Sequence, residues 1–257
     1  MKVKFGLILL ALIAFMGCKK ENLSVATSAN FAPFEYIEGG EFRGIDMEIA
    51  KVLAEELKLK LVINDMEFDS VVQSVASKNA RLGISGLTIN ETRKQVIDFS
   101  DTYFSASQMI LTKESDTNFD NLKTSNEVVE KLSSLKGVKI GVQVGTTGEF
   151  YAKGDKDWGF SGFANAEILS FTNGAMAVNA MLNNQIDIVI IDEMPAKVLE
   201  KSNKGTKLIN IALTSESYAI GINKDDKDLL EKVNNVIKAM KEDGRMEQII
   251  NKYYIKS

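Results

Sequence analysis

The chain has 257 residues, of which 45% are hydrophobic and 26% are charged, and its formal net charge at pH 7 is −4. This length suits one large domain or two modest ones, and the negative charge argues against a nucleic-acid-binding protein, which needs a concentrated basic face. The chain has no histidine and a single cysteine, Cys18. Those counts exclude Ser-His-Asp and Cys-His catalytic sites, His-ligated metals and an intrachain disulfide. We expect no cofactor and no metal site.

The first eighteen residues predict export. Lys2 and Lys4 precede an apolar run over residues 5–16, which is too short to span a bilayer but suits a signal peptide. The run ends at Gly17-Cys18, which resembles a bacterial lipobox. We therefore expect residues 1–17 to be a lipoprotein signal peptide, with residues 18–22 as lipidated anchor and tether at the periplasmic or outer face of a membrane. A plain signal peptide with an incidental cysteine is the alternative.

Beyond the tether, short apolar runs alternate with amphipathic segments. Strands are predicted over residues 23–26, 58–63, 80–87, 109–112, 138–142, 186–191 and 218–222. Helices are predicted over residues 45–57, 68–77, 173–182, 193–201, 226–242 and 245–253, with a short one from Glu91 capped by Asn90. Residues 113–134 are predicted to be a polar surface excursion. The alternation favours an α/β fold with largely parallel strands, and its restart at Val138 favours two separate sheets.

Four motifs occur in order along the mature chain, in residues 26–36, 44–49, 86–93 and 97–100. Together they resemble the extracytoplasmic solute-binding proteins of polar amino-acid ABC transporters, the family 3 solute-binding proteins. The resemblance implies a type II periplasmic-binding-protein fold of two lobes. It places residues 23–106 plus 218–257 in lobe 1 and residues 107–217 in lobe 2, with hinge segments near 103–107 and 215–218.

The third motif has a physical meaning of its own. Ser85, Gly86 and Thr88 end a predicted strand and lead into the helix that bears Arg93, and a guanidinium binds a carboxylate through two parallel hydrogen bonds. The resemblance implies that Arg93 and the Thr88 amide bind the α-carboxylate of an amino acid. It also implies that the Ser85 or Gly86 carbonyl and the Thr88 hydroxyl receive the α-ammonium. The plain alternative is that Arg93 pairs with Glu91 or Asp98 on the surface.

The second half of the site is expected from lobe 2. By resemblance, Thr146 and Thr147 in the glycine-rich turn 145–148 present amides to the carboxylate, and Asp192 takes the ammonium. Asp192 ends a buried strand, where it could instead cap the next helix. Phe31 and Phe68 are expected around the ligand side chain, or else in the core. The expected ligand site comprises Ser28, Phe31, Phe68, Ser85, Gly86, Thr88, Arg93, Gln143, Thr146, Thr147 and Asp192.

The charge of the site bears on the ligand. Ser28 and Gln143 stand where some relatives carry charged residues, so a cationic side chain would lack a counter-ion. We therefore expect a free L-amino acid with a neutral side chain. Glutamate is disfavoured, because the site has no spare cation to pair with its side-chain carboxylate. The expected mechanism is hinge closure of a monomer that delivers its cargo to an ABC permease.

Two other functions are compatible with the sequence. One is a cleft enzyme of the same fold, dehydratase-like, for which Glu149 beside the glycine-rich turn is the candidate acid. No second catalytic group is evident, so we expect no enzyme. The other is a sensor domain, for which the sequence has no kinase segment.

Overall fold

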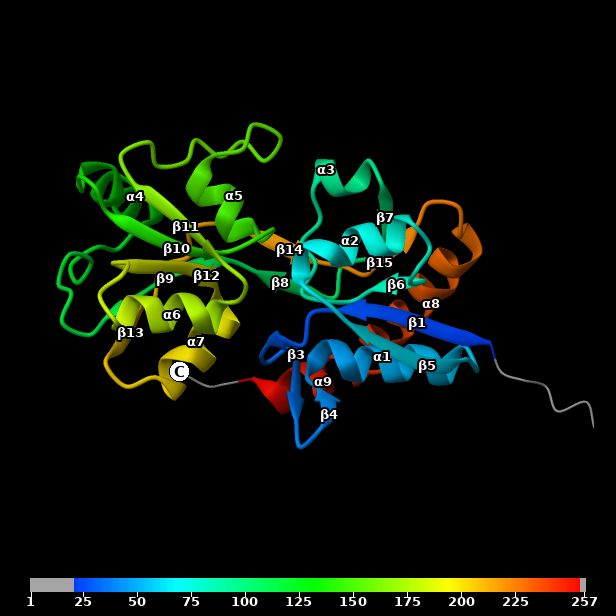
Figure 1. Cartoon of the computed structure of the whole chain (residues 1–257). Coiled ribbons are helices and arrows are strands. Elements are labelled where there is room, and N and C mark those ends of the chain that lie inside the picture. The colour runs from blue at the N-terminus through cyan, green and yellow to red at the C-terminus, as the bar shows by residue number, and fades with distance from the viewer. Residues whose placement is uncertain (1–20, 255–257) are drawn as a thin grey trace, which may run out of the picture.

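The computed structural model describes residues 21–254, which form two α/β lobes side by side (Figure 1). The predicted signal peptide and Cys18 lie outside the described residues. In residues 21–254 no helix has the length and apolar character that crossing a membrane requires.

Lobe 1 is built on a mixed five-stranded sheet in the order β5-β1-β6-β15-β7. Its strands are β1 (Asn22–Thr27), β5 (Lys60–Asp65), β6 (Leu82–Gly83), β7 (Ile97–Phe99) and β15 (Gly221–Asn223). Its helices are α1 (Ile45–Glu56), α2 (Phe68–Ala76), α3 (Glu91–Lys94), α8 (Lys227–Glu242) and α9 (Arg245–Tyr253). A small antiparallel sheet of β2 (Asn30–Phe31), β3 (Glu35–Glu38) and β4 (Glu41–Arg43) projects from it.

Lobe 2 repeats this plan with a sheet in the order β11-β10-β12-β9-β13. Its strands are β9 (Gln108–Lys113), β10 (Lys139–Gln143), β11 (Glu167–Phe171), β12 (Ile188–Asp192) and β13 (Thr206–Ile209). Its helices are α4 (Ser125–Ser134), α5 (Thr147–Lys153), α6 (Gly174–Leu182) and α7 (Glu193–Ser202).

Two crossing segments join the lobes. They contain β8 (Phe104–Ala106) and β14 (Glu216–Tyr218), which pair in antiparallel register between the two sheets (Figure 1). The chain enters β9 and β15 directly from these segments, and both strands run antiparallel to their neighbours. The sheets are therefore mixed, where the sequence favoured largely parallel ones. The lobe boundaries expected from the sequence stay predictions.

The sequence missed several elements. Residues 113–134 include α4, which begins at a capping box formed by Thr124 and Glu127, and the small sheet β2-β3-β4 was not predicted. The predicted strand 218–222 is two strands, because Ala219 and Ile220 leave the hinge pair before β15 begins. Long amphipathic helices such as α1 and α8 were located to within about two residues at each end, since their buried positions repeat with helical spacing.

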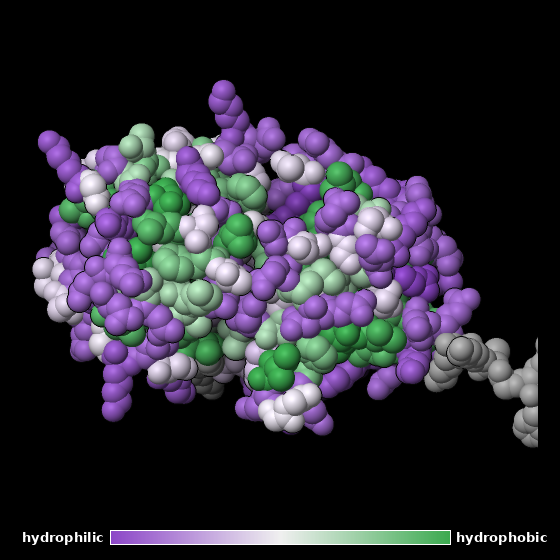
Figure 2. Space-filling view, in the orientation of Figure 1, coloured by the Kyte–Doolittle hydropathy of each residue, from purple (hydrophilic) through white to green (hydrophobic). Residues whose placement is uncertain are grey.

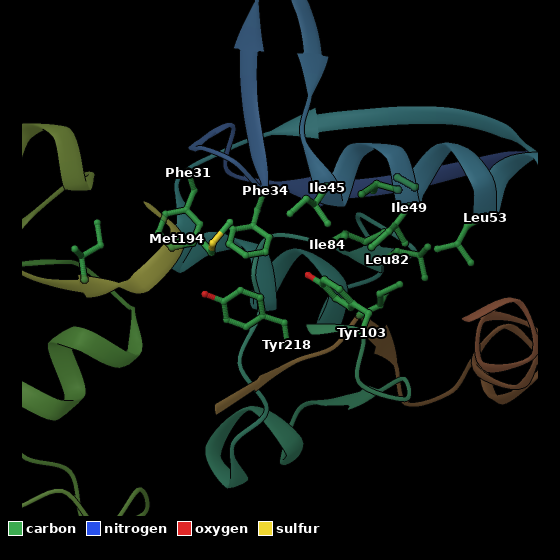
Figure 3. Close-up of a cluster of buried hydrophobic side chains, with 14 of the residues drawn as sticks. Phe31, Phe34, Ile45, Ile49, Leu53, Leu82, Ile84, Tyr103, Met194 and Tyr218 are labelled. Atoms are coloured by element: carbon green, nitrogen blue, oxygen red, sulfur yellow. The ribbon is translucent and has the colours of Figure 1, made fainter. Parts of the chain in front are cut away.

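A hydrophobic cluster continues from lobe 1 to the lobe interface. Phe34 and Tyr218 are fully buried and pack edge to face, with ring centroids 5.1 Å apart. Figure 3 shows both rings beside Phe31 and near Met194, the second residue of α7 in lobe 2. On the face shown in Figure 2, hydrophilic residues gather around the margins of both lobes, hydrophobic residues are mixed with them across the middle, and a recess lies between the lobes. The lobes are thus packed against each other in a closed arrangement.

Candidate functional site

The loops after β6, β10 and β12 face one another across the seam between the lobes. They form a small cavity of about 10 Å³. Its wall consists of Phe31, Phe68, Gly86, Thr88, Arg93, Gln143, Thr146, Thr147 and Asp192. Nine of the eleven residues proposed from the sequence therefore line one cavity, with contributions from both lobes.

Arg93 occupies the lobe 1 side of this cavity. The Asn90 side chain caps α3 by accepting the Arg93 amide at 2.6 Å, which fixes the backbone from which the guanidinium extends. Nη1 donates to the Thr88 carbonyl at 2.7 Å and Nη2 to the Gly145 carbonyl of lobe 2 at 3.0 Å, while the guanidinium lies 5.5 Å from the centroid of the Phe68 ring. Desolvation lowers the pKa of Arg93 to about 10, so the side chain remains a cation at neutral pH. The surface ion pair considered as an alternative does not form.

Asp192 lies at the end of β12 in lobe 2. Its side chain makes no capping hydrogen bond to α7; instead it accepts the hydroxyl of Tyr218 from the hinge strand β14. Burial, and then the charge of Glu216, raise the pKa of Asp192 to about 7. Asp192 thus lines the cavity and does not cap the helix.

The glycine-rich turn 145–148 brings lobe 2 against lobe 1. Gly145 has φ +75°, and a Cβ there would come within 3.1 Å of Cβ of Asp69 on α2, so a larger residue would disturb this contact between the lobes. Thr146 caps α5 and donates its hydroxyl to the Gln143 carbonyl at 2.7 Å. Thr147 Oγ1 donates across the seam to Thr88 Oγ1 at 3.2 Å.

Gln143 and Thr147 are buried in the cavity wall. The carboxamide oxygen of Gln143 has no hydrogen-bond partner within residues 21–254. A buried acceptor without a donor is costly. This atom is suited to accept a hydrogen from a small molecule in the cavity.

Ser28 and Ser85 do not line the cavity, although both are buried. Ser85 Oγ accepts the Ser28 amide at 3.0 Å and donates to the carboxylate of Glu35 at 2.7 Å. The two serines therefore organise the loop behind Gly86. Their roles as ligand contacts stay predictions.

Sequence reasoning missed a layer of buried carboxylates behind the wall. In lobe 1, Asp46 accepts the Gly86 amide at 2.7 Å and the Tyr103 hydroxyl at 2.9 Å, and burial raises its pKa to about 6. Burial, with the neighbouring Asp46, raises the pKa of Glu35 well above its usual value. Glu216 of the hinge strand accepts Thr88 Oγ1 at 2.9 Å. Asp46 stood inside a quoted motif, but spacing alone did not show which side chains face inward.

Glu149, the candidate acid of the enzyme alternative, does not line the cavity. Its carboxylate accepts the Gly145 amide at 2.7 Å, the Lys153 ammonium at 2.6 Å and the Ser170 hydroxyl. Burial acts to raise the pKa of Glu149, but these hydrogen bonds outweigh burial and lower it. An ionised, fully hydrogen-bonded carboxylate is a poor general acid. Within residues 21–254 no cluster of acidic, histidine or cysteine side chains suits a metal ion.

Comparison with known proteins agrees with this architecture. Residues 23–256 match the bacterial extracellular solute-binding proteins, family 3. The chain belongs to this family. Proteins similar to this chain include the arginine-binding extracellular protein ArtP of Bacillus subtilis, which is 30% identical over 239 residues, covering 91% of this chain and 87% of ArtP.

Two solved structures of ancestral proteins are also similar to this family 3 chain. An ancestral arginine-binding protein bound to glutamine shares 32% identity with a TM-score of 0.79, covering 91% of this chain and 98% of the other. The ancestral amino-acid-binding protein AncCDT-1, a precursor of cyclohexadienyl dehydratase, shares 31% identity with a TM-score of 0.78, covering 91% and 95%. The two-lobed type II fold predicted from the sequence is thereby confirmed.

Proposed function

We propose that this family 3 protein captures one free L-α-amino acid between its lobes and delivers it to an ABC permease. The observation that carries the proposal is that Arg93 and Asp192 face one cavity from opposite lobes. A cation and a carboxylate so placed are complementary to the two charged groups of a zwitterion. Because the ligand would touch both lobes only in the closed form, its binding would stabilise closure.

We infer that the side chain of the cargo is neutral and forms hydrogen bonds, as the carboxamide of glutamine does. Arg93 and Asp192 are the charged residues in the cavity wall, and the α-carboxylate and α-ammonium would satisfy both. The carboxamide oxygen of Gln143 has no hydrogen-bond partner within residues 21–254, so a ligand side chain that donates a hydrogen bond would satisfy it. The ancestral arginine-binding protein that is similar to this chain was solved with glutamine bound.

A second candidate is a cationic side chain such as that of arginine. One oxygen of Glu35 has no hydrogen-bond partner within the described part of the chain, and the carboxyl group lies directly behind Ser85. Glu35 would become the counter-ion by losing its proton when the cation binds. ArtP, named as an arginine-binding protein, is consistent with this candidate.

A thermal-shift panel of the common L-amino acids tests the proposal. We expect glutamine to raise the melting temperature more than arginine, because a ligand stabilises the native state by mass action. Arg93→Ala should remove the rise while leaving a cooperative melting transition. No shift with any amino acid would refute the amino-acid proposal. Turnover of a prephenate-like substrate would favour the enzyme alternative.

Titration calorimetry at several pH values separates the two candidate side chains. If arginine binds by ionising Glu35, the affinity for arginine should rise with pH relative to the affinity for glutamine. Glu35→Gln should then weaken the binding of arginine but not that of glutamine. Equal responses of both amino acids to Glu35→Gln would count against a counter-ion role. The result therefore assigns the charge of the cargo.

We also propose that Cys18 is lipidated and that the mature protein works as a monomer held at the membrane. Metabolic labelling with palmitate tests the anchor. The wild-type chain should incorporate label and Cys18→Ser should not. Labelling of the serine variant would show that the acyl chain is attached elsewhere.

A further inference from the structure

One carboxylate at the hinge is bonded to both lobes. Glu216 is the first residue of β14, and its side chain is 8% exposed. Oε2 accepts the hydroxyl of Thr88 in lobe 1 at 2.9 Å, whereas Oε1 accepts Nε2 of Gln108, on β9 in lobe 2, at 3.1 Å. Thr214 in the crossing segment donates to the same Oε1 at 2.6 Å. Each oxygen thus faces a different lobe.

The bond to Thr88 fixes the direction of its hydroxyl proton. A hydroxyl has one hydrogen to donate and two lone pairs, whereas a carboxylate can only accept. Thr88 must therefore give its proton to Glu216. Thr147 Oγ1 donates to one lone pair of Thr88 at 3.2 Å, and the other lone pair remains for the cavity, which Thr88 lines.

The backbone holds Glu216 and Thr88 in this relation. Thr88 forms a β-bridge with Tyr218, and the Ile89 amide donates to the Ser217 carbonyl at 3.2 Å. Residues 216 and 218 lie on the same face of β14 because strand side chains alternate. The same short strand therefore directs Glu216 toward Thr88 and the Tyr218 hydroxyl toward Asp192.

We propose, on the basis of the amino-acid-binding function above, that Glu216 is a positioning residue. It acts through Thr88, by making the Thr88 hydroxyl an obligate acceptor for the ligand α-ammonium once the lobes have closed. Glu216 itself stays behind the cavity wall, since it does not line the cavity.

A second readout comes from Asp192, the other acceptor expected for the ammonium. The groups that act on Asp192 are Glu216 and Tyr218 of the hinge strand, Gln108 of β9, Arg93 of α3 and Glu35 of β3. The Glu216 charge opposes ionisation of Asp192, whose pKa is about 7. At pH 6 about a tenth of such a group is ionised, so amino-acid affinity should fall by about tenfold between pH 8 and pH 6.

Calorimetric titration of the mature protein with L-glutamine and with L-arginine tests this role. At pH 8, Glu216→Gln should weaken binding by about tenfold, because its carboxamide can donate to Thr88 and turn the hydroxyl proton toward the ammonium. In a Thr88→Val background the same change should weaken binding by less than about twofold, since the group through which Glu216 acts is gone. Additive effects of the two substitutions would overturn the proposal.

The pH profile separates positioning from general damage to the fold. The amino-acid affinity of the Glu216→Gln variant should fall by less than about threefold between pH 8 and pH 6, because removing the charge lowers the pKa of Asp192. Glu216→Asp keeps the charge but withdraws it from Thr88, so it should bind weakly and retain the wild-type slope. If Glu216→Gln weakened binding by the same factor at every pH, so that the affinity kept its wild-type pH dependence, Glu216 would have a merely structural role.

Three controls keep the outcomes distinct. Glu231→Gln on the exposed side of α8 makes the same charge change and should match the wild type. If Glu216→Gln does not fold, as judged by its melting transition, Glu216→Asp decides alone, and normal affinity would refute the proposal. Binding of neither amino acid by the wild-type protein would instead refute the proposed function.

Discussion

At the level of single residues, lobe 1 contains buried carboxylates that form no ion pair within residues 21–254. Glu35 and Asp46 are both fully buried. Each has a raised pKa, for which burial is the leading cause. Keeping at least one of the two carboxyl groups neutral is the least costly arrangement, because two adjacent buried charges would repel. Asp46 is then free to hold the Gly86 amide, which shapes the cavity wall.

This arrangement predicts an unusual pH dependence of stability in the ligand-free protein. Asp46 has a native pKa of about 6 against an unfolded value of 3.8, so between these values the native state binds more protons. The stabilisation is complete below the unfolded value and is lost as pH rises through about 6. The free energy of unfolding should therefore fall between pH 5 and pH 8, by about 1 kcal/mol from this group.

Urea denaturation at several pH values measures the effect. Asp46→Asn retains an oxygen for the Gly86 amide but does not titrate, so its stability should vary less over the same range. A wild-type protein whose stability rises from pH 5 to pH 8 would contradict the assigned direction.

At the level of elements, the turn before α1 shows why its motif contains glycine. Gly44 precedes the helix with φ +119°, and a Cβ there would lie 2.1 Å from the Phe34 carbonyl oxygen. The Ile45 amide donates to the Pro33 carbonyl at 3.0 Å and the Asp46 amide to the Phe34 carbonyl at 2.9 Å. The close approach of the two backbones starts α1 where Asp46 can reach Gly86.

Gly44→Ala should therefore destabilise the protein by about 3 kcal/mol or more, from backbone strain together with the clash. Gly40→Ala is the matched control, because Gly40 also has a positive φ, +81°, but a Cβ there meets nothing within 4 Å. It should cost about 1 kcal/mol. Denaturant midpoints measure both variants, and equal costs would show that the contact with Phe34 relaxes freely.

Sequence patterns predicted the long helices and the buried central strands well, but they missed the outer strands β11 and β13 of lobe 2 and overextended β6. The helical spacing of α1 and the apolar run of β12 are local signals. The strands β8 and β14 have three residues each, too few for a period to emerge. Arg93 and Asp192 were found because charged residues followed predicted strands and matched family motifs. Glu216 was missed because its role depends on Thr88, 128 residues away in sequence.

At the level of the whole molecule, a loop of lobe 2 reaches over to lobe 1 beside the cavity. Thr92 Oγ1 on α3 donates to Asp157 of this loop at 3.3 Å. The next residue, Trp158, stacks on Phe150 at 5.6 Å between ring centroids. Trp158 also lines a groove that Thr88 and Glu216 border. The tryptophan thus lies at the seam between the lobes.

Ligand-driven closure should consequently change the emission of Trp158, which is the single tryptophan of the chain. Opening the lobes would hydrate the indole, so the binding of an amino acid should shift the tryptophan emission to shorter wavelength. The Arg93→Ala variant should show no shift at the same concentration. Calorimetric binding with unchanged emission would indicate that the lobes do not move at this seam.

The pairing of β8 with β14 brings the two ends of lobe 2 together, which bears on how this lobe can be exchanged between related chains. The strands of lobe 2 all lie between Gln108 and Ile209, whereas lobe 1 is assembled from the segments on either side. The two ends of this segment leave through adjacent hinge strands. Lobe 2 is therefore an inserted module whose entry and exit points are neighbours, a geometry that tolerates exchange. Transferring lobe 2 from one relative to another would combine the lobe that carries Asp192 with a different lobe 1, which carries the Arg93 side of the cavity, in a single exchange.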